Sequence, residues 1–357
     1  MSILRWGWND YFVAVWKDRE RGKTLPARVI AQGRGGWRVA GDFGECPGEA
    51  AGKLRLAAEE GADWPAVGDW VVAELRDQGS AAQIHEVLPR RSRFVRKMAG
   101  KKIAEQVIAA NVDVAFVVSA LDSDFNPRRV ERYLTQCWES GAKPVIVFNK
   151  ADVCEAPQEK IENMERIAMG VPVCAVSAKT GQGFDPLEKY LTPGQTVVLL
   201  GSSGVGKSTI VNRLMQRAIQ EVQEVRASDS RGRHTTTARE IFALPRGALL
   251  MDTPGLRELQ LWDADEGVSQ TFADIETLAA RCRFGNCRHD NEPACAVRAA
   301  IDAGAVDKDR LENWRKLQRE LEFLKRKLDP EVSRNEKQRI KQLMRGVNKM
   351  YRNREKS

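Results

Sequence analysis

The order of three short motifs constrains this chain more than any other feature. GSSGVGKS occupies residues 201–208 and DTPG residues 252–255, whereas NKAD comes earlier, at residues 149–152. Each motif follows an apolar run that is typical of a buried strand: TVVLL, ALLM and PVIVF respectively. STIVNRLM after the first motif predicts a helix, and a strand–loop–helix is the context that a phosphate loop requires. The sequence therefore predicts an α/β nucleotide-binding domain whose parts are in a circularly permuted order.

Each motif contains the residue types that its chemistry needs. The glycines of residues 201–206 let backbone N–H groups surround phosphate oxygens, Lys207 supplies a cation, and the Ser208 hydroxyl is a Mg²⁺ ligand. Asp252 falls at a strand end where it can hold the magnesium shell, and the N–H of Gly255 can meet a γ-phosphate. The Asp152 carboxylate only accepts hydrogen bonds, which suits the N1–H and 2-amino donors of guanine but not adenine. We predict a site for GTP with Mg²⁺.

Two further segments complete this prediction. SAK follows the apolar run VPVCAV, and RGRHTTT at residues 231–237 contains three threonines, any one of which can close over Mg²⁺ and the γ-phosphate. The sequence does not decide among Thr235, Thr236 and Thr237, and we name Thr236 as the candidate; most of the segment also fits a basic surface loop. The predicted GTP-binding residues are Asn149, Lys150, Ala151, Asp152, Ser177, Ala178, Lys179, Gly201, Ser202, Ser203, Gly204, Val205, Gly206, Lys207, Ser208, Thr209, Thr236, Asp252 and Gly255.

The residue that orients the attacking water is not obvious. Many GTPases have a Gln directly after DxxG, but this chain has Leu256, which cannot orient water by hydrogen bonding. His234 is the candidate catalytic residue, because an imidazole can accept or donate a proton near neutral pH. An RNA-binding role for His234 fits the sequence equally well. Either interpretation predicts slow intrinsic turnover, as in a molecular switch.

Three of the seven cysteines are clustered with one of the three histidines, in CRFGNCRHDNEPAC. Three thiolates and an imidazole form a tetrahedral zinc set, and nothing suggests an open coordination position. We predict one structural Zn²⁺, and the alternative is three free cysteines with an unrelated histidine. The other four cysteines are scattered and are predicted to be reduced thiols. The predicted zinc ligands are Cys282, Cys287, His289 and Cys295.

Positive charge is concentrated towards the C-terminus. Residues 310–357 contain sixteen Lys and Arg against seven Asp and Glu, a net charge of +9, whereas the whole chain carries +8. DKDRLENWRKLQRELEFLKRKL predicts an amphipathic helix, and NEKQRIKQLMRGVNKM predicts a second one. Basic helices beside a zinc module suit a nucleic-acid backbone, although a solvated amphipathic hairpin fits the same pattern. A second basic run, at residues 89–102, looks like a linker into the nucleotide domain.

The first part of the chain has an all-β pattern. Short alternating runs separated by Gly, Pro and Asp predict five strands and a small barrel, for which an OB-fold is the best fit. Such a barrel binds nucleic acid, and Trp37 and Trp70 are candidate stacking platforms, although a tryptophan in a small barrel more often belongs to its core. The five predicted strands are ARVIAQ, GWRVAG, KLRLAA, DWVVAEL and AQIHEVL.

Composition and the N-terminal segment limit where in the cell the protein is expected. Hydrophobic residues make up 42% of the chain, which allows several packed cores, and no apolar run is long enough to span a bilayer. The segment MSILRWGWNDYF lacks a basic region followed by an apolar one, so no signal peptide is predicted. We expect a cytoplasmic protein without a membrane partner.

The barrel and the motif order, together with GSSGVGKST, RGRHTTT, DTPGL and CRFGNCRHDNEPACAV, resemble the RsgA (YjeQ) family. The resemblance extends from about residue 26 to about residue 328. Members of that family are bacterial ribosome-biogenesis GTPases that bind the maturing small ribosomal subunit, hydrolyse GTP faster when bound, and then leave. The resemblance implies the same activity here, with rRNA and GTP or GDP as partners, Mg²⁺ with GTP, and one Zn²⁺. We also expect a monomer.

The sequence thus predicts a multidomain protein of three parts. They are an N-terminal segment and OB-fold barrel at 1–92, a circularly permuted α/β P-loop GTPase domain at 93–262, and an α-helical zinc-binding module with basic C-terminal helices at 263–357. The outer parts would clamp structured RNA, and a shift near Gly255 would move one relative to the other. Two other functional classes remain. One is a GTP-dependent enzyme that acts chemically on RNA, but the sequence contains nothing that resembles a nuclease or transferase site. The other is a zinc-containing RNA-binding protein with a vestigial nucleotide site, but the presence of Lys207, Ser208 and Asp252 argues against it.

Overall fold

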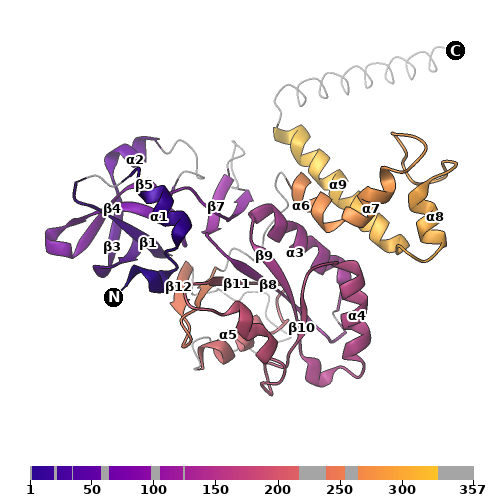
Figure 1. The fold of residues 1–357 in the computed structure, drawn as a ribbon, viewed down its shortest axis with the longest axis horizontal. Helices are drawn as coiled ribbons and strands as arrows, with labels where there is room; N and C mark the ends of the chain where they lie inside the picture. Colours follow the sequence, from indigo (N-terminus) through magenta and orange to yellow (C-terminus); the bar gives the residue numbers. More distant parts are fainter. Residues whose placement is uncertain are drawn as a thin grey trace, which may run out of the picture. The chain divides into compact units, whose positions relative to one another are not determined.

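The structure is a computed structural model that describes residues 2–19, 22–33, 35–57, 64–97, 105–123, 125–216, 239–253 and 264–328. The chain divides into two compact units, Met1–Gln260 and Leu261–Ser357 (Figure 1). The barrel and the nucleotide domain share the first unit. The domain limits expected after residues 92 and 262 stay predictions.

The first unit contains a closed five-stranded barrel. Its strands are β1 (Thr24–Gly33), β2 (Gly36–Gly41), β3 (Gly44–Ala50), β4 (Trp70–Arg76) and β5 (Ala81–Val87), with η2 (Asp77–Gly79) between the last two. They are arranged in the order β1-β2-β3-β5-β4, and β4 closes back onto β1. The β3–β5 pairing is parallel and the other pairings are antiparallel. Val29, Val39 and Ile84 fill the interior. The predicted OB-like barrel is confirmed.

One of the five predicted strands is wrong. KLRLA, in which Leu alternates with Lys and Arg, forms the helix α2 (Gly52–Ala57), with Leu54 buried and Leu56 85% exposed. The third strand is instead GECPGEA, which has few side chains that favour strands. Pro47 is tolerated in it because only residues 48–50 pair with β5, so no hydrogen bond to that strand is lost at the proline.

The N-terminal segment packs onto the barrel through aromatic side chains. It forms η1 (Ile3–Trp6) and α1 (Asp10–Trp16). The rings of Trp8 and Phe12 lie 4.7 and 5.6 Å from that of Trp70, measured between centroids. Trp70 is therefore 0% exposed, which bears out the core interpretation and excludes the alternative that Trp70 stacks on nucleic-acid bases. Trp37 is half-buried and stacks on Trp64, with 5.7 Å between their centroids.

The nucleotide domain is built on six neighbouring strands, which belong to the same sheet as the barrel strands. They are β8 (Val114–Ala120), β9 (Lys143–Asn149), β10 (Val173–Ala175), β11 (Thr196–Leu200), β12 (Arg239–Ala243) and β13 (Leu249–Asp252). Their order is β10-β9-β8-β11-β13-β12, in which all neighbours are parallel except β13 and β12. The carboxyl ends of β9, β11 and β13 therefore meet at one edge of the sheet, where open α/β sheets bind their ligands. The predicted α/β architecture is confirmed.

Helices cover both faces of these strands. They are α3 (Pro127–Ser140), α4 (Pro157–Ile167), α5 (Lys207–Met215), and the short turns η3 (Ala151–Val153) and η4 (Asp185–Tyr190). Ala115 and Val117 of β8 share a buried cluster with α3 and α4, whereas Phe116 and Val118 share one with α5 and η4. The side chains of β8 thus alternate between two apolar layers, as expected for a strand buried on both faces.

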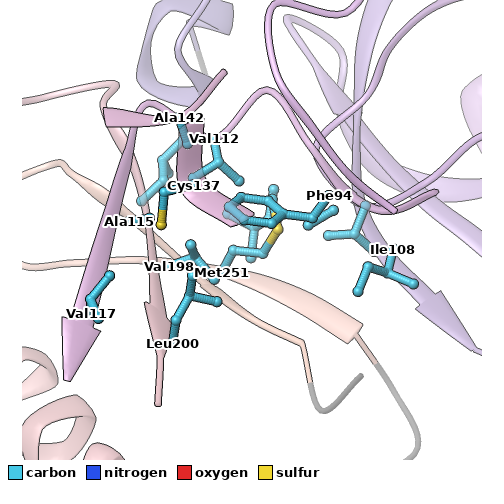
Figure 2. Close-up of a cluster of buried hydrophobic side chains, with 14 of the residues drawn as sticks. Phe94, Ile108, Val112, Ala115, Val117, Cys137, Ala142, Val198, Leu200 and Met251 are labelled. Carbon is cyan, nitrogen blue, oxygen red and sulfur yellow. The ribbon is translucent and has the colours of Figure 1, made fainter. Parts of the chain in front are cut away.

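The basic run at residues 89–102 is not a plain linker, so that interpretation is wrong. Within it, β6 (Arg93–Lys97) pairs antiparallel with β7 (Glu105–Ala110). Figure 2 shows Phe94 of β6 and Ile108 of β7 in one buried cluster with Val198 and Met251 of the nucleotide domain. The hairpin is therefore part of the core of that domain.

A continuous sheet joins the barrel to the nucleotide domain. Strand β12 pairs antiparallel with β1, so that Ala31 lies opposite Glu240 and Gln32 opposite Arg239. The resulting sheet has eleven strands, and Figure 1 labels most of them.

A buried arginine makes a second connection between the two parts. Arg28 of β1 donates hydrogen bonds to the carbonyls of Trp6, Gly68 (3.3 Å) and Asn111 (3.1 Å) and to Oγ1 of Thr196 (2.8 Å). Burial lowers the pKa of Arg28 to about 10, so the guanidinium stays charged at neutral pH. Because Thr196 begins β11, the barrel is attached to the strand that leads into the phosphate loop.

The second unit is a small helical domain. Its helices are α6 (Asp265–Thr271), α7 (Ala273–Ala279), α8 (Ala296–Asp302) and α9 (Lys308–Leu328). Helix α9 is the first basic helix predicted from sequence, and its apolar face, including Leu311, Trp314 and Leu317, is buried as expected. The second predicted basic helix lies outside the described residues. In the described part of the chain, no helix is long and apolar enough to cross a membrane.

Candidate nucleotide and metal sites

The phosphate loop connects β11 to α5, as the sequence predicts. Gly201, Gly204 and Gly206 have φ angles of 144°, 83° and 90°, which side-chain-bearing residues rarely adopt. A Cβ atom on Gly201 would lie 2.3 Å from the carbonyl oxygen of Val118, and one on Gly206 would lie 2.2 Å from Nδ2 of Asn149. This loop shape therefore depends on glycine for both its dihedral angles and its close contacts.

Lys207 begins α5 and is buried against the loop. Its Nζ donates to the carbonyl of Gly201 at 2.7 Å and to that of Ser202. The ammonium is thus held beside the loop backbone, and its contact with phosphate stays a prediction.

Asn149 joins segments from two other motifs. Its Nδ2 donates to the carbonyl of Val205 in the phosphate loop at 2.9 Å, and its Oδ1 accepts from the N–H of Ala178 in SAK at 3.0 Å. Asn149 is buried, so both hydrogen bonds are shielded from water. Residues from three separate strand ends are thereby fixed in one place.

Asp152 lies in the turn η3, exposed to solvent. A hydrogen bond with the Ser177 side chain lowers the pKa of Asp152, so it is an ionised acceptor at neutral pH. Lys150 adopts a left-handed φ of 63°, and its Nζ donates to Oδ2 of Asp122 at 2.8 Å. The role of Asp152 as the guanine-reading group stays a prediction.

Two residues near this site were not predicted from the sequence. Asp122 pairs with Lys150, and Arg129 of α3 donates from Nη1 to Oγ of Ser202 in the phosphate loop at 3.2 Å. Asp122 lies in the connection from β8 to α3, and Arg129 lies in the first turn of α3. Because β8 lies between β9 and β11, this connection comes between NKAD, which follows β9, and GSSGVGKS, which follows β11. The sequence feature that could have indicated these residues is DSDFNPRR, a polar segment that directly follows an apolar run.

The proposed magnesium ligands come from neighbouring elements. Ser208 lies in the first turn of α5, and Asp252 is the last residue of β13, which pairs in parallel with the strand before the phosphate loop. Both side chains offer oxygen atoms, the ligands that Mg²⁺ prefers. Thr236, Gly255 and the candidate catalytic His234 lie outside the described residues.

The four predicted zinc ligands meet in the second unit. Their ligand atoms all lie within 4.8 Å of one another. Cys282 Sγ is 3.6 Å from Nδ1 of His289 and 3.8 Å from Sγ of Cys295, and Cys295 Sγ is 3.4 Å from the same Nδ1. Tetrahedral Zn²⁺ with ordinary bond lengths separates two sulfurs by about 3.8 Å and sulfur from nitrogen by about 3.6 Å. Cys282, Cys287, His289 and Cys295 thus fit one tetrahedral metal ion.

The backbone conformation and the charge state of these residues suit metal binding. His289 adopts a left-handed φ of 62°, and Cys295 is the N-cap of α8, accepting from the N–H of Arg298. Burial and the nearby Arg315 lower the pKa of His289, so its imidazole is neutral at pH 7, as a metal ligand must be.

Two family models match parts of the chain. One, described as RsgA GTPase, matches residues 87–262, and the other, described as ABC transporter, matches residues 184–351. The phosphate loop lies in both ranges, and such loops are common to many nucleotide-binding families. The second range omits NKAD and runs across the Cys/His cluster, so it accounts for less of the site.

Curated relatives match nearly the whole chain. The small ribosomal subunit biogenesis GTPase RsgA of Opitutus terrae is 44% identical over 355 residues, which cover 97% of each chain. The protein of the same name from Syntrophotalea carbinolica is 44% identical and covers 90% of each chain. RsgA 2 of Lactiplantibacillus plantarum is 45% identical over 85% of each chain.

Two solved structures share the fold. YjeQ from Thermotoga maritima superimposes with a TM-score of 0.62 at 26% identity, covering 84% of this chain and 98% of that one. YloQ, described as a circularly permuted GTPase, superimposes with a TM-score of 0.59 at 22% identity, covering 84% and 95%. The rotated motif order, the OB-like barrel and the similarity to relatives over almost the full length agree, and the chain belongs to the RsgA GTPase family.

Proposed function

We propose that this chain is a GTP hydrolase that binds the small ribosomal subunit during late maturation and uses hydrolysis to time its release. The observation that carries the nucleotide part is the double hydrogen bond of Asn149, because it joins the phosphate loop to the guanine-reading SAK segment. One nucleotide can then contact both. The names of the curated relatives supply the ribosomal partner.

The site residues have separate tasks in this proposal. Lys207 and the backbone N–H groups of the loop hold the phosphates, Ser208 and Asp252 hold Mg²⁺, and Asp152 reads guanine. Mg²⁺ supplies charge neutralisation at the β- and γ-phosphates when it is bound. We retain Thr236 and Gly255 as γ-phosphate contacts and His234 as the residue that orients water. A leucine at position 256 leaves that orientation to another group.

The two other parts would bind rRNA, and the Cys/His cluster would hold a structural zinc ion that stabilises the second unit. A protein that works on ribosomal subunits acts in the cytoplasm. We propose that the protein is a monomer.

A hydrolysis assay with and without purified small subunits tests this function. We expect slow GTP hydrolysis alone and faster hydrolysis with subunits, and no hydrolysis by Lys207→Ala, which removes the phosphate-binding cation. A matched Lys143→Ala variant, at an exposed position that starts β9, should behave like wild type. Hydrolysis that persists in pure Lys207→Ala protein would contradict the assignment.

A further inference from the structure

One aromatic side chain of the second unit lies outside the core of that unit. Phe284 is in the loop between α7 and α8 and is 40% exposed. Among the described residues, the buried apolar cluster of the unit contains Phe272 and Trp314, and Phe284 does not belong to it. The ring therefore adds little to this core, although exposure alone does not indicate a ligand.

The turn that carries Phe284 is closed at its base by two of the four clustered metal ligands. Cys282 and Cys287 bound the segment CRFGNC, and their Sγ atoms lie within 4.8 Å of each other. Inside the segment, the N–H of Cys287 donates to the carbonyl of Phe284 at 3.2 Å. The backbone that carries the ring is thus held in one conformation before a ligand binds, which lowers the entropy cost of binding.

Three arginines share this turn with the exposed ring. Residues 281–289 contain three Arg and no Asp or Glu. The guanidinium carbon of Arg283 lies over the ring of Phe284, 5.5 Å from its centroid. Arg281 and Arg288 directly adjoin the two cysteines, so both extend from the closed base of the turn. The turn therefore combines one aromatic ring with three positive charges.

The next acidic residues along the chain are engaged with other groups. Asp290 pairs with Arg315 at 2.8 Å. The carboxylate of Glu292 accepts from three backbone N–H groups within residues 288–291. In the part of this unit that the structure describes, none of the three arginines of the turn forms an ion pair, so their charge is available to an anion.

We propose that Phe284 is a stacking platform for an unpaired base of RNA, and that the arginines of its turn bind the adjoining phosphates. Every base has a face that can stack on an aromatic ring, and guanidinium groups both stack on bases and pair with phosphates. Bases inside a duplex are already stacked on each other, so the site requires a base in a loop, a bulge or a single strand.

An apolar protein surface is a poorer occupant of this turn than RNA. Covering the ring with such a surface would also take three unpaired charges out of water, which is costly. A nucleic acid supplies an aromatic face and negative charge together. This inference rests on the proposed function, because it names a contact between the second unit and rRNA.

The test measures association of the full-length protein with purified small ribosomal subunits across a salt titration. We expect Phe284→Leu to weaken association roughly tenfold, because leucine keeps an apolar side chain but has no aromatic face. Phe284→Tyr keeps the ring and should bind like wild type. Neither variant should change the slope of log K against log salt, because stacking releases no counterions, whereas Arg283→Gln should lower that slope by about one.

A control variant makes the same substitution elsewhere in the second unit. Phe323 on α9 is 57% exposed and adjoins Glu322 rather than a group of arginines, and Phe323→Leu should bind like wild type. Zinc content is measured for every variant, because the tested turn lies between metal ligands. If Phe284→Leu does not keep its zinc, Arg283→Gln decides, and an unchanged slope in that variant overturns the site.

The outcomes separate this contact from the function on which it rests. Wild-type protein that does not bind subunits overturns the proposed function itself. If wild type binds and Phe284→Leu binds equally well, the ring does not stack on a base. If Phe284→Ala then weakens association although Phe284→Leu does not, the side chain makes an apolar contact with a ribosomal protein, and the RNA assignment is wrong.

Discussion

At the scale of single residues, the proposed recognition of the base depends on one exposed carboxylate. Asp152 is supported by Ser177, and its lowered pKa keeps it ionised well below neutral pH. Both residues follow strand ends, and the buried Asn149 fixes the SAK backbone next to them. We therefore expect a change at Asp152 to alter hydrogen bonding to the base without disturbing the core.

Asp152→Asn should weaken GTP binding by roughly 10- to 100-fold, because an acceptor that faces the guanine donors becomes partly a donor. The same variant should gain affinity for xanthosine triphosphate, whose 2-oxo group accepts a hydrogen bond. Binding of both nucleotides can be measured by titration calorimetry, with Asp185→Asn in η4 as a control for the loss of one charge. Equal GTP affinity in the variant and wild type would show that Asp152 does not read the base.

Most of the residue-level predictions depended on short motifs whose local context the sequence reveals. The residues of a phosphate loop, of NKAD and of a Cys/His cluster are close together in the sequence, so each motif could be recognised from the sequence alone. Arg129 and Asp122 were missed because their role depends on β8 lying between β9 and β11, which is a fact of strand order rather than of nearby sequence. A core position for Trp70 was the favoured interpretation, but the aromatic rings that cover it were not predicted, because they come from the N-terminal segment.

At the scale of elements, local pattern and tertiary setting disagree in two places. The alternation in KLRLA favoured a strand, yet the segment is a helix, while the Gly- and Pro-containing β3 was not predicted because its position depends on β2 and β5. The helices and strands around the phosphate loop were predicted well, because long apolar runs are buried on both faces. Two interactions that stabilise these elements can be tested: the Cys/His cluster and a buried ion pair.

The metal cluster should bind about one zinc ion per chain, as four protein ligands imply. Cys287→Ser should lower the zinc content and increase proteolysis of the second unit, because metal-binding energy contributes directly to the folding of a small module. Elemental analysis and limited proteolysis measure both effects, with Cys154→Ser as a control at a cysteine outside the cluster. Full zinc occupancy in Cys287→Ser would exclude that thiolate as a ligand.

The ion pair joins the segment between β5 and β6 to the residue that precedes β4 of the barrel. Arg90 donates from Nε and Nη2 to the two carboxylate oxygens of Asp69, both at 2.7 Å, and the side chains are 13% and 0% exposed. Arg90→Met should lower the free energy of unfolding by about 3–5 kcal/mol, because it leaves a buried charge unpaired. Arg91→Met, whose pair with Asp113 is exposed, should cost at most about 1 kcal/mol.

The pH dependence gives this prediction a second readout. Burial already raises the pKa of Asp69, and Arg90 opposes that effect. Without Arg90 the folded state binds a proton at Asp69 more readily than the unfolded state does, so stability falls as pH rises. Chemical denaturation should therefore show a smaller defect in Arg90→Met at pH 5 than at pH 8. A defect that is the same at both pH values would mean that the loss comes from packing rather than charge.

At the scale of the whole molecule, the strongest asymmetry is in charge. Residues 330–357 carry nine Lys and Arg against three Asp and Glu, and they lie outside the described residues. Removing them spares the barrel, the nucleotide site and the Cys/His cluster. We expect the truncated protein to keep its intrinsic GTP hydrolysis and to lose affinity for small subunits, most clearly at low salt, because phosphate contacts release counterions. Identical binding of truncated and full-length protein across a salt titration would leave the barrel and the hairpin as the RNA contacts.

The strand order has a consequence for how the chain is made. Synthesis delivers β8, β9 and β10 in succession, and these three lie side by side at one edge of the sheet. The half of the domain that carries the base-reading motif can therefore assemble on the translating ribosome before the phosphate loop has emerged. The barrel emerges earlier still, but its bond to the sheet through β12 must wait for residues 239–243. In a nascent chain of this permuted order, the barrel and the β8–β9–β10 half of the domain would thus form first. The strands β11, β13 and β12 would then be added next to β8 and would connect the two parts.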